Sequence, residues 1–351
     1  MAQWSSGVHG AITRLDAAGG RNFRARDKML PWALTQTRVA VIGAGSFGRH
    51  HLRILSQSPN AQLAGVVDSN ADRARAAGAE YACPIYDSTA ALAGKIDAAV
   101  VAVPTSAHAE VGCALLENGI DVLVEKPIAS DLASARLLVD TAARHGRILQ
   151  VGHLERFNPG VVALKKIVSR PLFFEVHRLC LFSPRSLDVD VVLDLMIHDL
   201  DIVLDLAGGM PEEIRAAGIS ILSDKVDIAN VRLAFPGGCV ANLTASRVST
   251  ERVRKLRLFQ PHQYISLDYQ KQDAVVFTVS GNQQIGFQPL AVAKDEPLRL
   301  EMEAFIEAVR TRERPRASGE EGLRALEVAL AILAKIEEHA EVVAQQIQLL
   351  P

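Results

Sequence analysis

The sequence predicts an α/β fold with two sheets, a parallel doubly wound sheet first and an open, mainly antiparallel sheet after it. From Arg38 to Val151, short β-branched runs alternate with helical segments, an order typical of parallel sheets. From Phe173 onward that order stops and alternating apolar runs follow one another. A chain of 351 residues also exceeds one ordinary hydrophobic core, so we expect two domains.

Composition and charge exclude several classes of protein. The 49% hydrophobic and 22% charged residues are typical of a soluble globular chain, and a net charge of −2 argues against a nucleic-acid partner. No run reaches the roughly 18 apolar residues of a membrane span, so we expect no membrane partner. Four cysteines far apart, without a CxxC pair, favour a reduced, cytoplasmic compartment. Residues 1–37 lack apolar periodicity and a secretory core, which predicts a disordered extension.

The first expected strand, residues 39–42, ends in three glycines. Gly43 permits a tight turn, Gly45 lets the backbone approach a pyrophosphate, and Gly48 lets the next helix pack on the strand. Free N–H groups at the start of that helix favour an anion. We therefore predict a dinucleotide-binding loop, which comprises Gly43, Gly45, Ser46, Phe47 and Gly48.

An acidic residue ends the second expected strand, residues 63–68. Asp68 lies 20 residues after Gly48, where a dinucleotide fold places the carboxylate that accepts hydrogen bonds from the ribose. Its charge would repel a 2′-phosphate, so we expect NAD(H) rather than NADP(H). Glycine-rich turns are common, but the strand, helix and acid around this one favour a cofactor loop over a structural turn.

The remaining elements are expected in the same order. Expected helices cover 70–79, 88–93, 107–118, 132–145, 189–206, 298–310 and 320–339. Expected strands cover 84–86, 96–103, 121–124, 147–151, 173–179, 231–235, 240–244, 255–259, 264–268 and 274–278. These predict an extension (1–37), a cofactor-binding domain (38–152), a substrate and oligomerisation domain (153–297), and C-terminal helices that pack back on the core (298–351).

Polar segments follow three strands of the first sheet, namely 104–108, 125–127 and 152–159. In a doubly wound sheet, ligands bind beyond the carboxyl ends of the strands. Lys126 follows a buried strand and precedes a proline, so we expect its ammonium group over this crevice, where it would stabilise a developing alkoxide. The alternative is a surface lysine paired with Glu125.

The expected helix 189–206 carries four polar residues at intervals of three or four, Asp194, His198, Asp201 and Asp205, which share one side. Histidine suits proton transfer near neutral pH, and a carboxylate one turn away would orient it. A solvated acidic face with a satisfied histidine is one alternative. A metal site is another, which the lack of a nearby His/Glu pair at ligand spacing disfavours.

Together, the glycine loop, Glu125-Lys126-Pro127 after the fifth expected strand and Asp194-x-x-x-His198 resemble the Gfo/Idh/MocA family, from about Arg38 to His339. The resemblance implies a Rossmann domain with NAD, an open sheet used in homo-oligomers (dimers or tetramers), and oxidation or reduction of a sugar or cyclitol hydroxyl.

The resemblance also implies roles for single residues. Lys126 would contact the reacting oxygen, His198 would be the general acid/base, and Asp194 would support it. The loops that border the cofactor would include Pro104, Thr105, His108, Glu125 and Lys126. The usual Thr-Pro order is reversed here to Pro104-Thr105.

Within the family, residues 152–159 and 188–200 most resemble enzymes that act on UDP-N-acetylhexosamines. This implies oxidation at C3 of UDP-N-acetylglucosamine, whose 3-keto product can be aminated on the way to lipid A. Candidate substrate contacts, besides Lys126, Asp194 and His198, are Asn158 and the arginines Arg156, Arg178, Arg185 and Arg247, for the diphosphate. Ordinary surface or interdomain roles remain the alternative for the arginines.

Other functions stay open at this point. They are a dehydrogenase of another sugar or of a cyclitol such as inositol, an NAD-dependent glycosidase, and a non-catalytic NAD-sensing protein.

Overall fold

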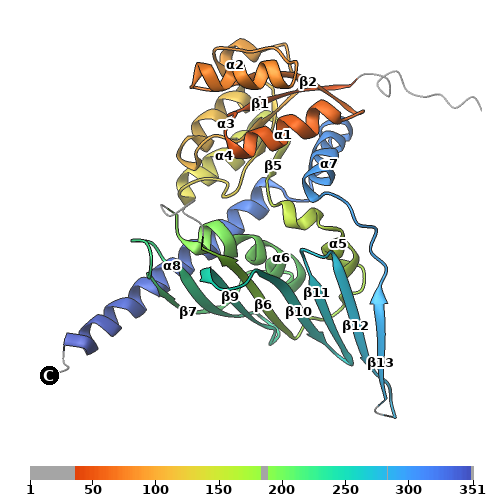
Figure 1. Cartoon of the computed structure of the whole chain (residues 1–351), viewed down its shortest axis with the longest axis vertical. Coiled ribbons are helices and arrows are strands. Elements are labelled where there is room, and N and C mark those ends of the chain that lie inside the picture. The colour runs from red at the N-terminus through yellow and green to blue at the C-terminus, as the bar shows by residue number, and fades with distance from the viewer. Residues whose placement is uncertain (1–35, 183–188, 283, 349–351) are drawn as a thin grey trace, which may run out of the picture. The chain divides into compact units, whose positions relative to one another are not determined.

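The computed structural model describes residues 36–182, 189–282 and 284–348, with side chains as far as Val342. Residues 1–35 of the predicted extension (1–37) and Arg185 lie outside this range, whereas Thr37 already begins the first strand. Two sheets organise the described chain (Figure 1). No helix in the described range is long and apolar enough to cross a membrane.

The first sheet has five parallel strands in the order β2-β1-β3-β4-β5. Their bounds are β1 (Thr37–Ile42), β2 (Ala61–Val67), β3 (Ala98–Val101), β4 (Asp121–Val124) and β5 (Leu149–Val151). Every residue of β3, β4 and β5 is buried, as expected for strands covered on both faces. The strand order reverses between β1 and β3, and this reversal opens the crevice used by ligands in such folds.

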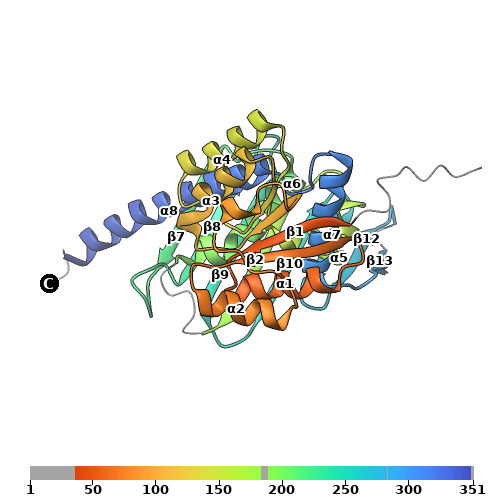
Figure 2. The ribbon, with the colours of Figure 1, turned by 90° about the horizontal axis from the view of Figure 1, so that it is seen from above.

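Helices cover both faces of this sheet, as Figure 2 shows from above. One face packs on α1 (Ser46–Gln57), α2 (Ala71–Glu80) and α7 (Pro297–Thr311), with Leu52 and Phe305 in its cluster. The other face packs on α3 (His108–Glu117), α4 (Leu132–His145) and the start of α8 (Gly319–Gln348). The predicted doubly wound sheet is therefore confirmed.

Two elements expected in the first half of the chain, one strand and one helix, differ from the prediction. Residues 84–86 do not form a strand, because Pro84 has no N–H to donate and only Ile85 makes an isolated bridge, to Val66. The helix expected at 88–93 is a short 3₁₀ turn, Thr89–Leu92. Glu125 consequently follows the fourth strand of the chain, and the prediction of a fifth strand before it was wrong.

The second sheet has eight strands in the order β13-β12-β11-β10-β6-β9-β8-β7. Their bounds are β6 (Phe173–Leu181), β7 (Glu213–Ile219), β8 (Ile228–Ala234), β9 (Val240–Ser249), β10 (Val253–Gln260), β11 (Gln263–Asp268), β12 (Asp273–Val279) and β13 (Ile285–Leu290). Only β6 and β9 pair in parallel, so the predicted mainly antiparallel sheet is confirmed.

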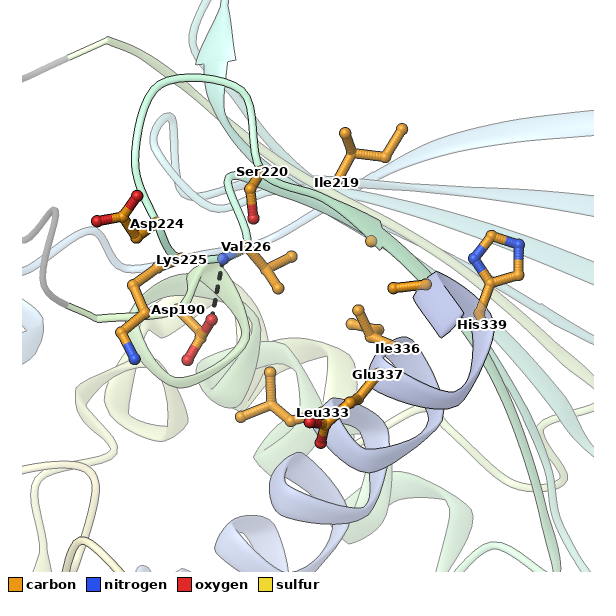
Figure 3. Close-up of a pocket in the computed structure, with 12 residues that line it drawn as sticks. Asp190, Ile219, Ser220, Asp224, Lys225, Val226, Leu333, Ile336, Glu337 and His339 are labelled. Atoms are coloured by element: carbon orange, nitrogen blue, oxygen red, sulfur yellow. Dashed lines mark hydrogen bonds between the residues drawn. The ribbon is translucent and has the colours of Figure 1, made fainter. Parts of the chain in front are cut away.

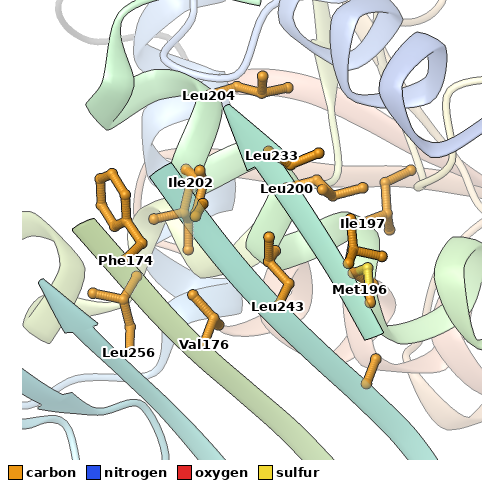
Figure 4. Close-up of a cluster of buried hydrophobic side chains, with 14 of the residues drawn as sticks. Phe174, Val176, Met196, Ile197, Leu200, Ile202, Leu204, Leu233, Leu243 and Leu256 are labelled. Carbon is orange, nitrogen blue, oxygen red and sulfur yellow. The ribbon is translucent and has the colours of Figure 1, made fainter. Parts of the chain in front are cut away.

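One face of the second sheet is covered by helices: α5 (Pro159–Lys165), a π-helical turn (Val192–Met196), α6 (Ile197–Ala207) and α8. Figure 4 shows Ile197 and Leu200 of α6 against Val176 and Leu243 of the sheet. All four side chains are at most 1% exposed, and burial of such a side chain is worth about 1.5–3 kcal/mol. This packing fixes α6, and with it His198, on the sheet.

The uncovered face carries a row of aromatic rings across five neighbouring strands. Successive ring centroids lie 5.8, 4.7, 5.2 and 5.3 Å apart. We call this row the aromatic ladder, and its members are Phe173, Phe259, Tyr264, Phe277 and Phe287. Phe287, on the edge strand β13, is 64% exposed.

A cavity of about 750 Å³ lies between the edge strand β7 and α8 (Figure 3). Leu333 and Ile336 of α8 face Val226, whose N–H donates a hydrogen bond of 2.9 Å to Asp190. Its lining lacks the lysine and histidine predicted to be catalytic, so the candidate site lies elsewhere.

Candidate active site

The glycine loop after β1 has room for a phosphate group. Gly43 has φ of +96°, and a Cβ on it would lie 2.5 Å from the Ala102 carbonyl oxygen. A Cβ on Gly48 would lie 1.8 Å from the oxygen of Gly43, so this close contact also requires glycine. At Gly45, by contrast, a Cβ would meet no described atom within 4 Å. The loop therefore leaves open space where a pyrophosphate would approach the backbone.

The start of α1 provides donors toward that space. Gly45 is the N-cap residue, and no side chain of the described residues caps this helix. Its first N–H groups and the helix dipole are thus available to an anion. Ser46 begins the helix, and Phe47 is 40% exposed, with its ring centroid 6.0 Å from that of His50.

Asp68 lies beside this loop, directly after β2. Its carboxylate accepts hydrogen bonds of 2.7 Å from the N–H groups of Ala44 and Asn70, and Arg73 donates to it at 2.9 Å. Burial opposes ionisation of Asp68, but these hydrogen bonds lower its pKa below the ordinary value. The ionised group is thus held where the adenosine ribose of NAD would lie. When bound, NAD supplies the hydride acceptor.

Lys126 joins the two halves of the site. Its Nζ donates to the backbone oxygen of Asp194 at 2.6 Å and to the Asp194 Oδ1 at 3.3 Å, across 68 positions of sequence. The Lys126 side chain is 16% exposed, so its charge lies at the rim and not in open solvent. Its partner is Asp194, whereas the Glu125 side chain turns inward to His51 at 2.5 Å. The alternative of a surface Lys126–Glu125 pair was therefore wrong.

Glu125 itself belongs to the interior. It is 7% exposed, and a Cβ on Gly152 would lie 2.8 Å from its Oε2. Its contact with His51 links the loop after β4 to helix α1. The Glu125 side chain thus packs inside the protein, where it contacts His51, and its predicted contact with NAD stays a prediction.

His198 is the second residue of α6, which begins at Ile197, and it is 9% exposed. Burial, with the nearby charges of Lys126 and Arg178, lowers the pKa of His198 well below its ordinary value. The imidazole is thus neutral at pH 7, the form that accepts a proton.

The contacts of Asp194 differ from those expected. Its carboxylate accepts a hydrogen bond from Lys126, and no hydrogen bond of the described residues joins that carboxylate to His198. The π-helical turn Val192–Met196 widens the helix here, so the α-helical spacing used for the prediction does not apply. Further along α6, Asp201 and Asp205 are paired with Arg156 and Lys165 and do not form a solvated face.

Two arginines predicted to bind a diphosphate are buried in ion pairs. Arg156 donates to both oxygens of Asp201, at 2.6 and 2.8 Å. Arg178 does the same with Asp199, at 2.6 and 2.8 Å, and also contacts Glu155 at 3.1 Å. Burial opposes their charge, but these carboxylates raise the pKa of both guanidinium groups. A diphosphate would have to displace a bidentate partner, so we withdraw both arginines as ligands.

The other two described candidates also serve the fold. Asn158 caps α5 by accepting from the Gly160 N–H at 3.0 Å, and it donates to the Tyr269 carbonyl at 3.0 Å. Arg247 is 6% exposed, and it donates to the Val189 carbonyl. Arg185 lies outside the described residues.

The loop after β3 is tied to the loop after β4 by His108. Its two ring nitrogens lie 3.0 Å from the carbonyl oxygens of Val103 and Pro127. Burial lowers the pKa of His108, and the ring is 1% exposed. His108 thus holds the loop that contains Pro104 and Thr105, and its own predicted contact with NAD stays a prediction.

Three buried polar residues of this region were not singled out from the sequence, although His153 lies in the polar segment 152–159: His51, His153 and Glu301. Glu301 on α7 is 0% exposed, and its carboxyl oxygens have no hydrogen-bond partner within the described chain. The sequence does indicate that Glu301 is buried, because this residue lies on the apolar side of the helix, between Leu298 and Phe305. Among the described residues, no cluster of three potential ligands is arranged for a metal ion.

A doubly wound sheet with an open glycine loop after β1, an acid after β2, and a rim lysine near a neutral histidine is typical of a nicotinamide-dependent oxidoreductase. The model described as "Oxidoreductase family, NAD-binding Rossmann fold" matches residues 37–153, and that of the "GFO/IDH/MocA C-terminal domain" matches residues 182–261. The chain belongs to the Gfo/Idh/MocA family.

Individual relatives span almost the same length. UDP-N-acetylglucosamine 3-dehydrogenase of Acidithiobacillus ferrooxidans is 36% identical, with 86% of this chain and 97% of that protein covered. A solved structure of that enzyme has a TM-score of 0.82 at 35% identity, covering 87% and 99% of the two chains. Inositol 2-dehydrogenase of Rhizobium meliloti is 26% identical, with 87% and 98% covered. The chain is thus similar to sugar and cyclitol dehydrogenases.

Proposed function

We propose that this protein oxidises the C3 hydroxyl of UDP-N-acetylglucosamine to the 3-keto sugar, with NAD as the hydride acceptor. The observation that supports this most is the placement of Lys126 and neutral His198 at one rim of the NAD-binding sheet. The 36% identical dehydrogenase supports the choice of substrate. The product would be aminated on the way to lipid A, in the cytoplasm.

Each catalytic side chain has one task in this proposal. His198 removes the proton of the sugar hydroxyl, while the hydride leaves the same carbon and a C=O bond forms. Lys126 stabilises the charge that develops on the oxygen. Asp194 orients Lys126 through its carbonyl and carboxylate oxygens. Because His198 is neutral before the step, it can take up the proton directly.

The first test is the absorbance of NADH while the protein and NAD⁺ are offered UDP-N-acetylglucosamine, free N-acetylglucosamine and myo-inositol in turn. We expect a rise with the nucleotide sugar. A rise only with myo-inositol would favour a cyclitol, the second candidate, because inositol dehydrogenases are among the relatives. A rise only with the free sugar would refute the nucleotide requirement.

The second test separates the catalytic residues from the fold. Lys126→Ala and His198→Ala should each lower kcat by about 100-fold or more while NADH still binds. Lys95→Ala is a matched control, since the Lys95 ammonium lies over the Tyr86 ring, away from the site. Normal turnover in either site variant would refute its role.

We also propose that the protein is a homo-oligomer, a dimer or tetramer, joined through the aromatic ladder. Exposed rings such as Phe259 and Phe287 form an apolar stripe that a second copy would cover. Light scattering should show the oligomer, and the double variant Phe259→Ser and Phe287→Ser should shift it toward monomers. An unchanged mass in the variant would exclude this face.

A further inference from the structure

Arg254 lies on the second sheet, next to the ion pair that flanks His198. It belongs to β10, where the register of the sheet sets it directly opposite Arg178 of β6. Residues two apart on a strand point to the same face, and the neighbours Leu256 and Val176 lie in the core beneath the helices. Arg254 is therefore on the helix-covered face of the sheet, the face that packs against α6.

The partners of these two arginines differ. Arg178 donates to both oxygens of Asp199, the residue after His198, and it also contacts Glu155. The Nε of Arg254 is buried without a hydrogen-bond partner in the described chain, and no described carboxylate pairs with its guanidinium group. Two arginines opposite each other on a sheet repel, and a buried N–H without an acceptor is costly. The described residues thus neutralise Arg178 and supply no acceptor for Arg254.

The surroundings of Arg254 link it to the candidate active site. Its carbonyl oxygen accepts a hydrogen bond of 3.0 Å from the N–H of Tyr269, whose ring packs on the Arg178 guanidinium group at 5.2 Å. The charge of Arg254 is also among those that lower the pKa of His198, and such an effect falls with distance. Arg254 is only partly buried, so part of its side chain is accessible to a ligand.

We propose that Arg254 binds the anionic group of the substrate, which is the diphosphate of the nucleotide sugar. The inference rests on the proposed function, because that function supplies the substrate. In UDP-N-acetylglucosamine the diphosphate is attached to C1 of the same six-membered ring whose C3 is oxidised. A cation near His198 therefore suits this substrate, whereas a free sugar or a cyclitol has no anionic group to offer it.

A guanidinium group also fits a diphosphate by its geometry. It donates two parallel hydrogen bonds to phosphate oxygens, and a phosphate oxygen would give the buried Nε of Arg254 its acceptor. Arg156 and Arg178 are held by the carboxylates of Asp201 and Asp199. Arg254 thus takes the role that was expected of these two arginines.

The test is calorimetric titration of UDP into the protein saturated with NADH, so that the glycine loop is already occupied. We expect Arg254→Met to bind UDP at least tenfold more weakly than wild type, because the charge-assisted hydrogen bonds are lost. Arg254→Lys keeps the charge and should recover part of the affinity. Uridine, which has no phosphate, should bind all three proteins alike.

Arg257→Met is the matched control, because Arg257 is on the same strand, faces the uncovered side of the sheet and pairs with Glu175. It should bind UDP as wild type does. An NADH titration checks the fold of each variant. The preference of wild type for UDP over uridine, at least tenfold, is a readout that needs no variant.

Turnover of UDP-N-acetylglucosamine separates binding from chemistry. Arg254→Met should raise KM at least tenfold and change kcat by less than about threefold, since the diphosphate is bound alike before and during the reaction. If wild type bound UDP but oxidised no nucleotide sugar, the proposed function would fail, whereas the UDP affinities would still decide the role of Arg254. Equal UDP affinity in wild type and Arg254→Met, or equal affinity of wild type for UDP and uridine, would overturn the inference.

Discussion

Glu301 allows a direct test of how burial shifts the pKa of a carboxyl group inside this protein. It is 0% exposed on α7, and burial, with the nearby Glu125 carboxyl group, raises its pKa well above 4.5. The folded protein therefore keeps the Glu301 proton at pH values where the unfolded chain has lost it. Below pH 4.5 both states are protonated. Above it, stability falls by about 1.4 kcal/mol per pH unit until Glu301 ionises in the folded state.

Glu301→Gln removes this proton uptake while keeping the size of the side chain. Between pH 5 and pH 7, the free energy of unfolding of the variant should rise relative to wild type, by at most about 2.7 kcal/mol if Glu301 stays protonated in the folded protein over this whole range. The unpaired amide adds a cost that does not depend on pH, so the change with pH is the quantity to compare. The measurement is thermal unfolding at both pH values, where the Tm of the variant relative to wild type should rise from pH 5 to pH 7, by at most about 4 °C.

Glu303→Gln is the control, because Glu303 lies on the same helix, is 36% exposed and pairs with Arg299. Its difference from wild type should stay below about 1 kcal/mol at both pH values. A difference between Glu301→Gln and wild type that is the same at pH 5 and pH 7 would refute the reasoning, since Glu301 would then ionise alike in both states.

Three further predictions concern the cofactor loop and a buried ion pair. Gly45→Ala should fold normally, since its Cβ has open space, but lose about tenfold or more in NADH affinity by fluorescence titration; unchanged affinity would place the pyrophosphate elsewhere. Asp68→Asn should raise the affinity for NADPH relative to NADH by about tenfold or more, and an unchanged ratio would contradict its role. Arg178→Met should destabilise the protein by about 3–5 kcal/mol, against less than about 1 for the exposed Arg257→Met, as thermal unfolding would show; equal effects would mean that the buried pair is weak.

The elements that could be predicted from the sequence are those whose pattern of apolar and polar residues matches their burial in the fold. The central strands of the first sheet are short apolar runs, and they were found because both of their faces are buried. The edge strands β7 and β13 were missed, since Gly218 interrupts one and nearly all of β13 is exposed. The seven-residue helix α5 was missed for its shortness, although Asn158 and Pro159 mark its start.

The site was predictable in position but not in its pairings. The crevice edge follows from strand direction, so Lys126 and the glycine loop could be placed from sequence. The contact of Lys126 with Asp194 depends on how α6 and its π-helical turn pack over that edge, across 68 positions. The arginines were misjudged for the same reason, because Asp199 and Asp201 of α6 reach them only in the folded chain.

Helix α8 belongs to two hydrophobic cores at once. Leu326 packs in the cluster beneath α3 and α4, while Ile332 and Ile336, two and three turns later, pack in the cluster of the second sheet. Because both cores contain side chains of α8, unfolding of one half of the protein would remove packing contacts from the other half. We therefore expect calorimetry to show one cooperative transition, in which the NAD-binding half and the half that carries His198 are lost together. Binding of NADH alone should then protect both halves against heat.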